Sequence, residues 1–279
     1  MQYSNKVTGT KANITAYCDR FNKRVRIDDY AGNLEEVKKM IEDSSKEINA
    51  EKIILKARSE HLLSFIEKGY VLEAVIRGFF NGNDVYFLAK FMTEERRMSA
   101  HWQKSEEIFT DVHGLEEETR NPLHRFQLQK AGVKDAERLA ALYEKVFPVY
   151  PVPLQKPDYV RKAMESGTVF LFIEKNDEII SAASAEIDVF NGNAELTDCA
   201  TLPSYRGGGL MKQLLNGLEA ELAGQQIFCV YTIARSLSFG MNAAFKQLGY
   251  RYGGRLVNNC FIYDKMEDMN IWWKDLSRE

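Results

Sequence analysis

Histidine is absent from the second half of this 279-residue chain. The four histidines are His61, His101, His113 and His124, and none follows residue 124. A Ser–His–Asp or Cys–His site needs an imidazole to take the proton of the nucleophile, and histidine is a frequent ligand of zinc. We therefore exclude both kinds of site from the second half and interpret the four histidines as ordinary surface or satisfied residues.

Paired cysteines and long apolar runs are also lacking. The four cysteines show no paired metal-ligand spacing and are Cys18, Cys199, Cys229 and Cys260. This pattern predicts reduced, buried thiols in a cytoplasmic protein. No stretch approaches the run of about 20 apolar residues that a membrane-spanning helix needs, and the first residues have no apolar signal core. We expect no membrane partner.

An excess of positive charge is missing as well. The chain has 37 Lys and Arg against 40 Asp and Glu, for a formal net charge of −3, and a pI near 6.0. This balance argues against a nucleic acid as the main partner. With 45% hydrophobic and 28% charged residues, the chain is globular and can bury a sizeable core in one large or two ordinary domains.

A glycine-rich turn is the most informative feature that is present. Residues 194–215 read AELTDCATLPSYRGGGLMKQLL, which predicts a strand, a turn and a helix with an apolar stripe. Three consecutive glycines let the backbone N–H groups converge, and the helix adds unpaired N–H groups and a positive dipole end. The turn therefore predicts a site for an anion such as pyrophosphate.

The residues after the turn narrow the kind of anion site. A Walker loop needs Gly-Lys-Ser/Thr, and a dinucleotide fingerprint needs a third glycine where Lys212 stands. The turn instead resembles the acetyl-CoA loop of the GNAT superfamily of N-acyltransferases, Arg/Gln-x-x-Gly-x-Gly/Ala, with Arg206, Gly209 and Met211 on its positions. Met211 departs from the usual small residue. A glycine-rich connection without a ligand is the alternative interpretation.

A second stretch, 242–250 (NAAFKQLGY), resembles the GNAT helix that packs beside the CoA arm. Phe245 replaces the tyrosine thought to protonate the departing thiolate, so that role must lie elsewhere or be unnecessary. The resemblance implies acetyl-CoA as co-substrate. It places the cofactor contacts, including a bulged strand whose backbone pairs with pantetheine, at Cys199, Ala200, Thr201, Arg206, Gly207, Gly208, Gly209, Leu210, Met211, Asn242 and Phe245.

A carboxylate is the expected general base. An alkyl ammonium has a pKa of about 10.4 and must lose a proton before it attacks a thioester, and a carboxylate can remove that proton. Glu195 stands four residues before Cys199, a spacing that resembles the histone-acetylating branch and its catalytic Glu. The alternative is a solvent-facing carboxylate. Strand alternation puts Asp198 on the opposite face unless a bulge intervenes.

Three further roles follow from position. The backbone N–H of Cys199 is expected to stabilise the tetrahedral oxyanion, as backbone donors do well. Tyr231 and Ser238 are candidates to protonate the departing thiolate. Tyr150 lies in the proline-rich loop 148–153, where GNAT enzymes wall the acceptor site; a solvated loop is the alternative.

The element order predicts an α/β (α+β) GNAT fold, a mixed twisted sheet flanked by helices, at residues 123–279, after a smaller α/β domain at 1–122 and a linker at 110–122. In the first part we expect strands 14–17, 24–27, 52–56, 71–80 and 85–92 and helices 34–48 and 61–67. In the second we expect strands 125–130, 169–174, 179–189, 194–201, 227–233, 252–256 and 260–263, and helices 135–147, 158–165, 210–218 and 241–248.

The first part echoes the second. Gly69-Tyr70 corresponds to Gly249-Tyr250. At the position that corresponds to the phosphate loop, the first part has residues 28–33, DDYAGN. Two aspartates there would repel pyrophosphate. The echo favours a degenerate GNAT-like half that keeps the fold and has lost the cofactor, serving as a dimer surface in a homodimer or as a wall of the active site. Chance similarity among α/β units is the alternative.

Four stretches resemble the bacterial and archaeal beta-lysine N-acetyltransferases: 77–83 (RGFFNGN), 85–91 (VYFLAKF), 147–153 (FPVYPVP) and 267–272 (EDMNIW). That family acetylates the ε-amino group of L-beta-lysine and forms the osmolyte Nε-acetyl-beta-lysine. Such a substrate needs an anion-recognising group and an anionic or aromatic partner for its second ammonium, for which Arg235 and Asp198 are candidates. The rival functions are acetylation of a polyamine, antibiotic or protein lysine, and a non-catalytic acyl-CoA sensor.

Overall fold

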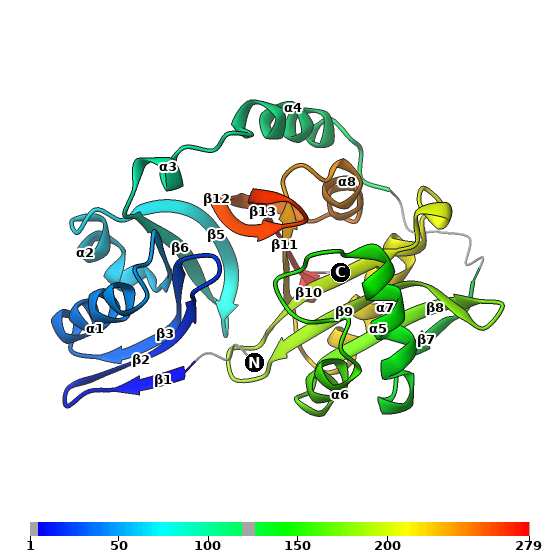
Figure 1. The fold of residues 1–279 in the computed structure, drawn as a ribbon, viewed down its shortest axis with the longest axis horizontal. Helices are drawn as coiled ribbons and strands as arrows, with labels where there is room; N and C mark the ends of the chain where they lie inside the picture. Colours follow the sequence, from blue (N-terminus) through cyan, green and yellow to red (C-terminus); the bar gives the residue numbers. More distant parts are fainter. Residues whose placement is uncertain (1–4, 119–125, 279) are drawn as a thin grey trace.

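One mixed sheet runs through the whole molecule (Figure 1). The computed structural model describes residues 5–118 and 126–278. Its thirteen strands lie in the order β1-β2-β3-β4-β6-β5-β12-β13-β11-β10-β9-β8-β7. Their bounds are β1 Asn5–Thr8, β2 Ala12–Asp19, β3 Arg24–Gly32, β4 Lys52–Ala57, β5 Val71–Phe80, β6 Asn83–Phe91, β7 Leu128–Lys130, β8 Val169–Lys175, β9 Glu178–Asp188, β10 Asn193–Thr201, β11 Cys229–Arg235, β12 Arg251–Ile262 and β13 Lys265–Asp275.

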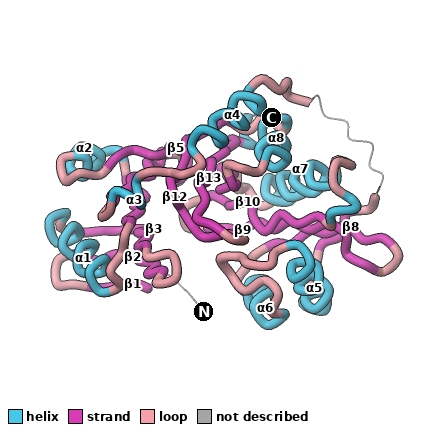
Figure 2. The backbone as a smooth tube through the Cα atoms, turned by 45° about the horizontal axis from the view of Figure 1, so that its top comes forward, coloured by secondary structure: helices cyan, strands magenta, loops and turns pink. Residues whose placement is uncertain are grey.

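The helices pack on this sheet through apolar stripes. They are α1 Leu34–Glu47, α2 Leu62–Ile66, α3 Glu94–Arg97, α4 Trp102–His113, α5 Ala136–Val146, α6 Pro157–Glu165, α7 Leu210–Gly224 and α8 Phe239–Gln247. In the second half α7 covers one side of the strands, and α5 and α6 cover the other (Figure 2). The buried leucines of α7 and α5 join the strands in one large core.

The predicted elements are confirmed in order, and the differences lie mainly in polar segments. Strand β1 and helices α3 and α4 were not predicted, and residues 110–113 end α4 rather than open a linker. The predicted strands 252–256 and 260–263 are one strand, β12, with two register shifts. Strand β13 was missed although it is central. Its buried residues include the polar Glu267, Asp268 and Asn270, which make the segment resemble a loop in sequence.

The expected domain boundary at 122/123 and residue 125, the first of the predicted strand 125–130, lie outside the described residues, as does His124. Residues 126 and 127 are described and lie before the strand, which begins at Leu128. The two halves of the described chain have the same order and pairing of strands and helices. Each half has an antiparallel three-strand meander, a helix, a strand parallel to the last of the three, a short helix, and a hairpin whose second strand pairs with the parallel strand. We propose that the first half, β1 to β6, is a degenerate copy of the second.

The two halves differ at the helix that follows the meander. Helix α1 is closed at its N-terminus, because the side-chain oxygen of Asn33 accepts hydrogen bonds from the N–H groups of Glu35 and Glu36. Asp28 lies just before this turn. Helix α7 begins at Gly209 without any side-chain cap. Since an anion needs open N–H groups, the repeat leaves an anion site at α7 and closes the equivalent place at α1.

The halves meet where β5 pairs antiparallel with β12, with Gly254 opposite Ala74. The buried ammonium of Lys52 lies 2.8 Å from the carboxylate of Glu73 and donates to the carbonyl of Val257 at 2.7 Å. Glu73 in turn accepts the N–H of Val257 at 2.8 Å. A buried ion pair of this kind persists only when further hydrogen bonds satisfy it. The junction is therefore held by backbone pairing and by one satisfied polar cluster.

The substitution Gly254→Ala tests this junction. At Gly254, where φ is +140°, an added Cβ would lie 2.1 Å from the carbonyl oxygen of Glu73. At Gly69, where φ is +83°, it would meet nothing within 4 Å. We expect Gly69→Ala to cost about 1–2 kcal/mol from backbone strain alone. Gly254→Ala should cost about 2 kcal/mol more, because β5 must move. Urea unfolding measures both, and equal costs would contradict the packing described.

Candidate active site

The site is built where β10 parts from β11. The two strands pair in parallel only from Asn193 to Glu195, opposite Cys229 to Tyr231. On its other side β10 stays paired with β9, with a register shift between Thr197 and Ala200. Beyond Glu195 the backbone of β10 that faces β11 has no strand partner. The sheet is thus open along a strand whose polar groups remain available to a ligand.

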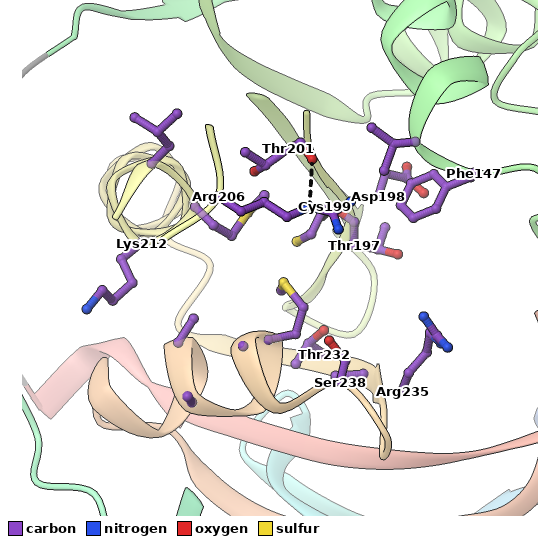
Figure 3. Close-up of a pocket in the computed structure, with 18 of the residues that line it drawn as sticks. Phe147, Thr197, Asp198, Cys199, Thr201, Arg206, Lys212, Thr232, Arg235 and Ser238 are labelled. Carbon is purple, nitrogen blue, oxygen red and sulfur yellow. Dashed lines mark hydrogen bonds between the residues drawn. The ribbon is translucent and has the colours of Figure 1, made fainter. Parts of the chain in front are cut away.

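A cleft of about 600 Å³ fills this opening. Residues of β10 lie on one side of it, and Thr232, Arg235 and Ser238 lie on the other (Figure 3). The glycine-rich turn and the start of α7 line one end, and the loop between α5 and α6 lines the other, with Tyr150. We call this the β10–β11 cleft.

The glycine-rich turn presents open backbone donors to the cleft. Gly207 and Gly209 have φ of +79° and +78°, which L-residues with a side chain adopt at a cost. Among the described residues, no carbonyl accepts the N–H groups of residues 207–212, whereas that of Arg206 bonds to Pro203. The Arg206 side chain donates to the Thr201 carbonyl at 3.1 Å (Figure 3). A Cβ at either glycine would meet nothing within 4 Å, so the turn fits a diphosphate.

Glu195 lies at the point where the strands part. In the register of the sheet it stands opposite Glu186 on β9 and opposite Tyr231 on β11. Burial, and secondly the charge of Glu186, raise the pKa of the Glu195 carboxyl to about 7, although Lys56, Arg26 and a hydrogen bond with Tyr231 lower it. A carboxylate with a pKa near neutrality is suited to general base catalysis. Glu195 is half-buried, unlike the solvent-facing carboxylate of the alternative interpretation. Together with Tyr231 it lines a second cavity rather than the β10–β11 cleft.

A bulge in β10 between Thr197 and Ala200 puts Asp198 on the same face as Glu195. Its φ is +52°, and its carboxylate accepts the hydroxyl of Ser184 at 2.7 Å. Ser184 is two residues from Glu186 on β9, so both point to one face. Burial and then Glu186 raise the pKa of Asp198 to about 7, against hydrogen bonds with Ser184 and Tyr150. The exception that the sequence left open, an intervening bulge, thus applies.

The two other predicted catalytic residues are protonated and enclosed. Burial raises the pKa of the Cys199 thiol far above its usual value, so this residue is no thiolate nucleophile. Its backbone lies in the unpaired stretch of β10, as the oxyanion role requires. Burial also raises the pKa of Tyr231, and its hydroxyl remains a proton donor beside Glu195. Tyr150, a predicted substrate residue, is likewise kept protonated by burial.

Arg235 lines the cleft but already has a partner. Its guanidinium pairs through two nitrogens with the fully buried carboxylate of Glu267. The same group lies 4.4 Å from the ring centroid of Tyr263. Arg235 and Glu267 therefore compensate each other in charge one to one, which leaves Arg235 little attraction for a further carboxylate.

Four predicted cofactor residues do not line the cleft. Ala200 and Phe245 are fully buried in the core, and Phe245 packs 4.9 Å from Tyr250 between ring centroids. Asn242 donates to the carbonyls of Arg235 and Ser238 and accepts from two residues of β13. Gly208 is also outside the lining, unlike Cys199, Thr201, Arg206, Gly207, Gly209, Leu210 and Met211.

Helix α8 contributes other residues, which the sequence did not indicate. Met241, Ala244 and Gln247 line the cleft, three and six residues along one helical face. The resemblance led to Asn242 and Phe245, which point the other way and hold the helix in place. A helical projection of the segment, with Phe245 in the core, would have indicated the opposite face.

The described residues contain neither a helix long and apolar enough to cross a membrane nor a cluster of three or more His, Cys, Asp or Glu residues suited to a metal ion. Cys229 and Cys260 are buried as predicted, whereas Cys18 and Cys199 are only half-buried.

The sequence matches one family model and several known acetyltransferases. Residues 136–250 match the sequence model of the Acetyltransferase (GNAT) family. The chain is 41% identical over 261 residues to the N-acetyltransferase YodP of Bacillus subtilis (strain 168), covering 92% of this chain and 94% of the relative. It is 35% identical over 255 residues to a Beta-lysine N(6)-acetyltransferase of Methanococcus maripaludis, covering 91% and 93%.

A third relative is the Beta-lysine N(6)-acetyltransferase of Methanosarcina mazei, 37% identical over 231 residues, or 75% of this chain and 85% of the relative. These identities extend through both halves of the chain. They bear out the resemblances found in the sequence, including the α/β acyltransferase fold and acetyl-CoA as co-substrate. The chain belongs to the beta-lysine N-acetyltransferase family of the GNAT superfamily and is an acetyl-CoA-dependent N-acetyltransferase.

Proposed function

We propose that this enzyme acetylates the ε-amino group of L-beta-lysine and forms Nε-acetyl-beta-lysine, a compatible solute. Two relatives named for this reaction support the acceptor, while the relative with 41% identity carries only the general name N-acetyltransferase. One structural observation carries the chemistry. It is the enclosed carboxylate of Glu195, with a pKa of about 7, at the place where the strands of the cleft part.

We propose that the co-substrate is held by backbone groups. The open N–H groups at Gly207 to Met211 and the positive end of α7 would bind the diphosphate. The unpaired backbone of β10, from Cys199 to Thr201, would bind the pantetheine amides. This arrangement aims the thioester along β10 toward Glu195, since the bound chain runs from the turn back to the point where the strands part.

In the proposed reaction Glu195 takes one proton from the acceptor ammonium. The lone pair of the resulting amine forms the new C–N bond at the thioester carbon, and the C–S bond breaks. The N–H of Cys199 would donate to the oxyanion formed in between. The leaving thiolate needs a proton. Tyr231 is the proposed donor, because its hydroxyl stays protonated and shares a hydrogen bond with Glu195, which can return the first proton taken from the amine. Glu195, deprotonated again, would then take the second proton that the attacking nitrogen must lose to become the neutral amide, and would release it to solvent.

Asp198 is proposed as a second anionic group beside the reacting amine of the acceptor, with Tyr150 next to it. Both lie on the Glu195 face and line the cleft. A carboxyl with a raised pKa is stabilised in its charged form by a neighbouring ammonium. A cationic acceptor would therefore lower the pKa of this carboxyl group and bind more tightly above neutral pH.

Incubation of the purified protein with acetyl-CoA tests the proposal. L-beta-lysine, L-lysine, spermidine, an aminoglycoside and a lysine-containing peptide are supplied in parallel, and release of free CoA thiol is followed. We expect turnover with beta-lysine to exceed that with each of the others. Turnover only with another amine would replace beta-lysine by that acceptor. CoA binding without turnover of any amine would favour the sensor, the alternative that Phe245 suggested.

Substitution of Gly209 tests the diphosphate site. At a φ of +78° an alanine is strained by about 1–2 kcal/mol. The backbone relieves this strain by changing its conformation, which moves the N–H groups of the turn. We expect Gly209→Ala to weaken CoA binding about tenfold, as measured by calorimetry. Gly167→Ala is the control, since Gly167 has a φ of +99°, has nothing within 4 Å of an added Cβ and lies outside the cleft. Unchanged CoA affinity in Gly209→Ala would contradict the site.

Substitution of Glu195 tests the base. A base works only when deprotonated, so kcat/KM of the parent should rise with pH through an apparent pKa near 7. We expect Glu195→Gln to lower kcat about 10²–10⁴-fold and to remove this rise, with CoA affinity unchanged. Glu178→Gln is the control, because Glu178 is an exposed carboxylate at the start of β9. A variant that keeps parental kcat and the same pH profile would exclude Glu195 as the base.

A further inference from the structure

A second cavity, of about 320 Å³, lies between the two halves. Its walls are β3 and β4 of the first half, with Arg26 and Lys56, and β9, β10 and β11 of the second half, with Glu186, Glu195 and Tyr231. Ile233 lines both this cavity and the β10–β11 cleft. The two spaces are therefore neighbours at the place where β10 and β11 part. We call the smaller space the inter-half cavity.

In the part of the cavity formed by β3 and β4, Arg26 and Lys56 both pair with the single carboxylate of Asp28. Arg26 donates two hydrogen bonds to Asp28, at 2.7 and 3.1 Å. Lys56 lies 2.9 Å from the same carboxylate. Two cations thus share one anion and retain a net positive charge, whereas Arg235 in the cleft is matched one to one by Glu267. A carboxylate entering the inter-half cavity would be attracted to Arg26 and Lys56.

The second half supplies two carboxylates to the same cavity. Glu186 and Glu195 stand directly opposite each other on β9 and β10. Glu186 is open to the cavity, and among the described residues it has no ion-pair partner within salt-bridge distance. A pair of facing carboxylates that repel each other is relieved by an ammonium placed between or beside them.

We propose that the inter-half cavity binds the acceptor, a short diamino acid, with its carboxylate on Arg26 and Lys56, its non-reacting ammonium on Glu186 and its reacting amine at Glu195. This rests on the proposed function. It also gives the first half a role, since the half without a cofactor site provides the residues that recognise the amino-acid end. Arg26 and Lys56 are then specificity residues rather than catalytic ones.

The charges of cavity and ligand match. With all groups ionised, the lining has three cations (Arg24, Arg26 and Lys56) and four carboxylates (Asp28, Glu186, Asp188 and Glu195), which leave the cavity with one negative charge. L-beta-lysine, 3,6-diaminohexanoate, carries two ammonium groups and one carboxylate and so has one positive charge. A polyamine has no carboxylate for Arg26 and Lys56, and a lysine within a protein presents neutral peptide groups there. The cavity therefore favours a free diamino acid over both.

Two acceptors that differ by one carboxylate test the proposal. L-beta-lysine is compared with 1,4-diaminopentane, its decarboxylated analogue, in the parent and in Arg26→Gln and Lys56→Met. We expect each variant to lower kcat/KM for beta-lysine about ten- to a hundredfold, mainly through KM. Loss of either cation also raises the pKa of Glu195, so rates are compared at a pH well above the apparent pKa of each variant. Under that condition the same variants should leave kcat/KM for 1,4-diaminopentane and the KM for acetyl-CoA within about twofold.

Arg77→Gln is the matched control, because Arg77 pairs with Asp84 in the first half and lies outside the cavity lining; it should change neither acceptor. Thermal unfolding of each variant shows whether it is folded, and either Arg26→Gln or Lys56→Met alone suffices. Equal losses for both acceptors, or no loss for beta-lysine, would overturn the assignment of the cavity while leaving the proposed function intact. A parent enzyme that acetylates other amines but not beta-lysine would overturn the proposed function and this inference together.

Discussion

The loss of hydrogen bonding between β10 and β11 beyond Glu195 is the constraint on which the site depends. A continuous ladder would occupy the backbone groups of Cys199 to Thr201 and leave no opening in the sheet. Because β10 remains paired with β9, the opening keeps one rigid wall. The bulge at Asp198 lies in β10 itself. The glycine-rich turn and the uncapped start of α7 follow it within about a dozen residues of the chain. One local departure from regular pairing thus positions base, oxyanion donor and anion site together.

The repeat shows how little is needed to remove such a site. The first half keeps the meander, the crossover helix and the parallel strand. A single asparagine at the start of α1 satisfies the N–H groups of Glu35 and Glu36 with its own side chain. The aspartates that precede this turn in the sequence are paired with cations, Asp28 with Arg26 and Lys56, and Asp29 with Arg58. In the proposed assignment, Arg26 and Lys56, which lie beside Asp28 in the first half, bind the acceptor that the second half acetylates.

The sequence was sufficient for the local features and insufficient for the contacts between distant strands. The glycine-rich turn, its helix and Glu195 were found because they lie within 22 adjacent residues. The face on which Asp198 lies could not be decided, because it depends on a bulge that cannot be read from alternation. Strand β13 was missed because its buried Glu267, Asp268 and Asn270 have partners far away in sequence. Arg26 and Lys56 gave no signal, since only the packing of the two halves brings them near Glu195. Glu186 reaches Glu195 through the pairing of β9 with β10, a register that the sequence does not show.

The junction of the halves has the symmetry of a dimer contact. Strands β5 and β12 occupy equivalent places in the two repeats, and they pair antiparallel, as identical surfaces do across a two-fold axis. Two separate units would each expose that strand as a free sheet edge. Joined in one chain, they cover both edges, and the remaining ends of the sheet are β1 and β7, only four and three residues long. The duplication therefore shields the polypeptide from edge-to-edge aggregation.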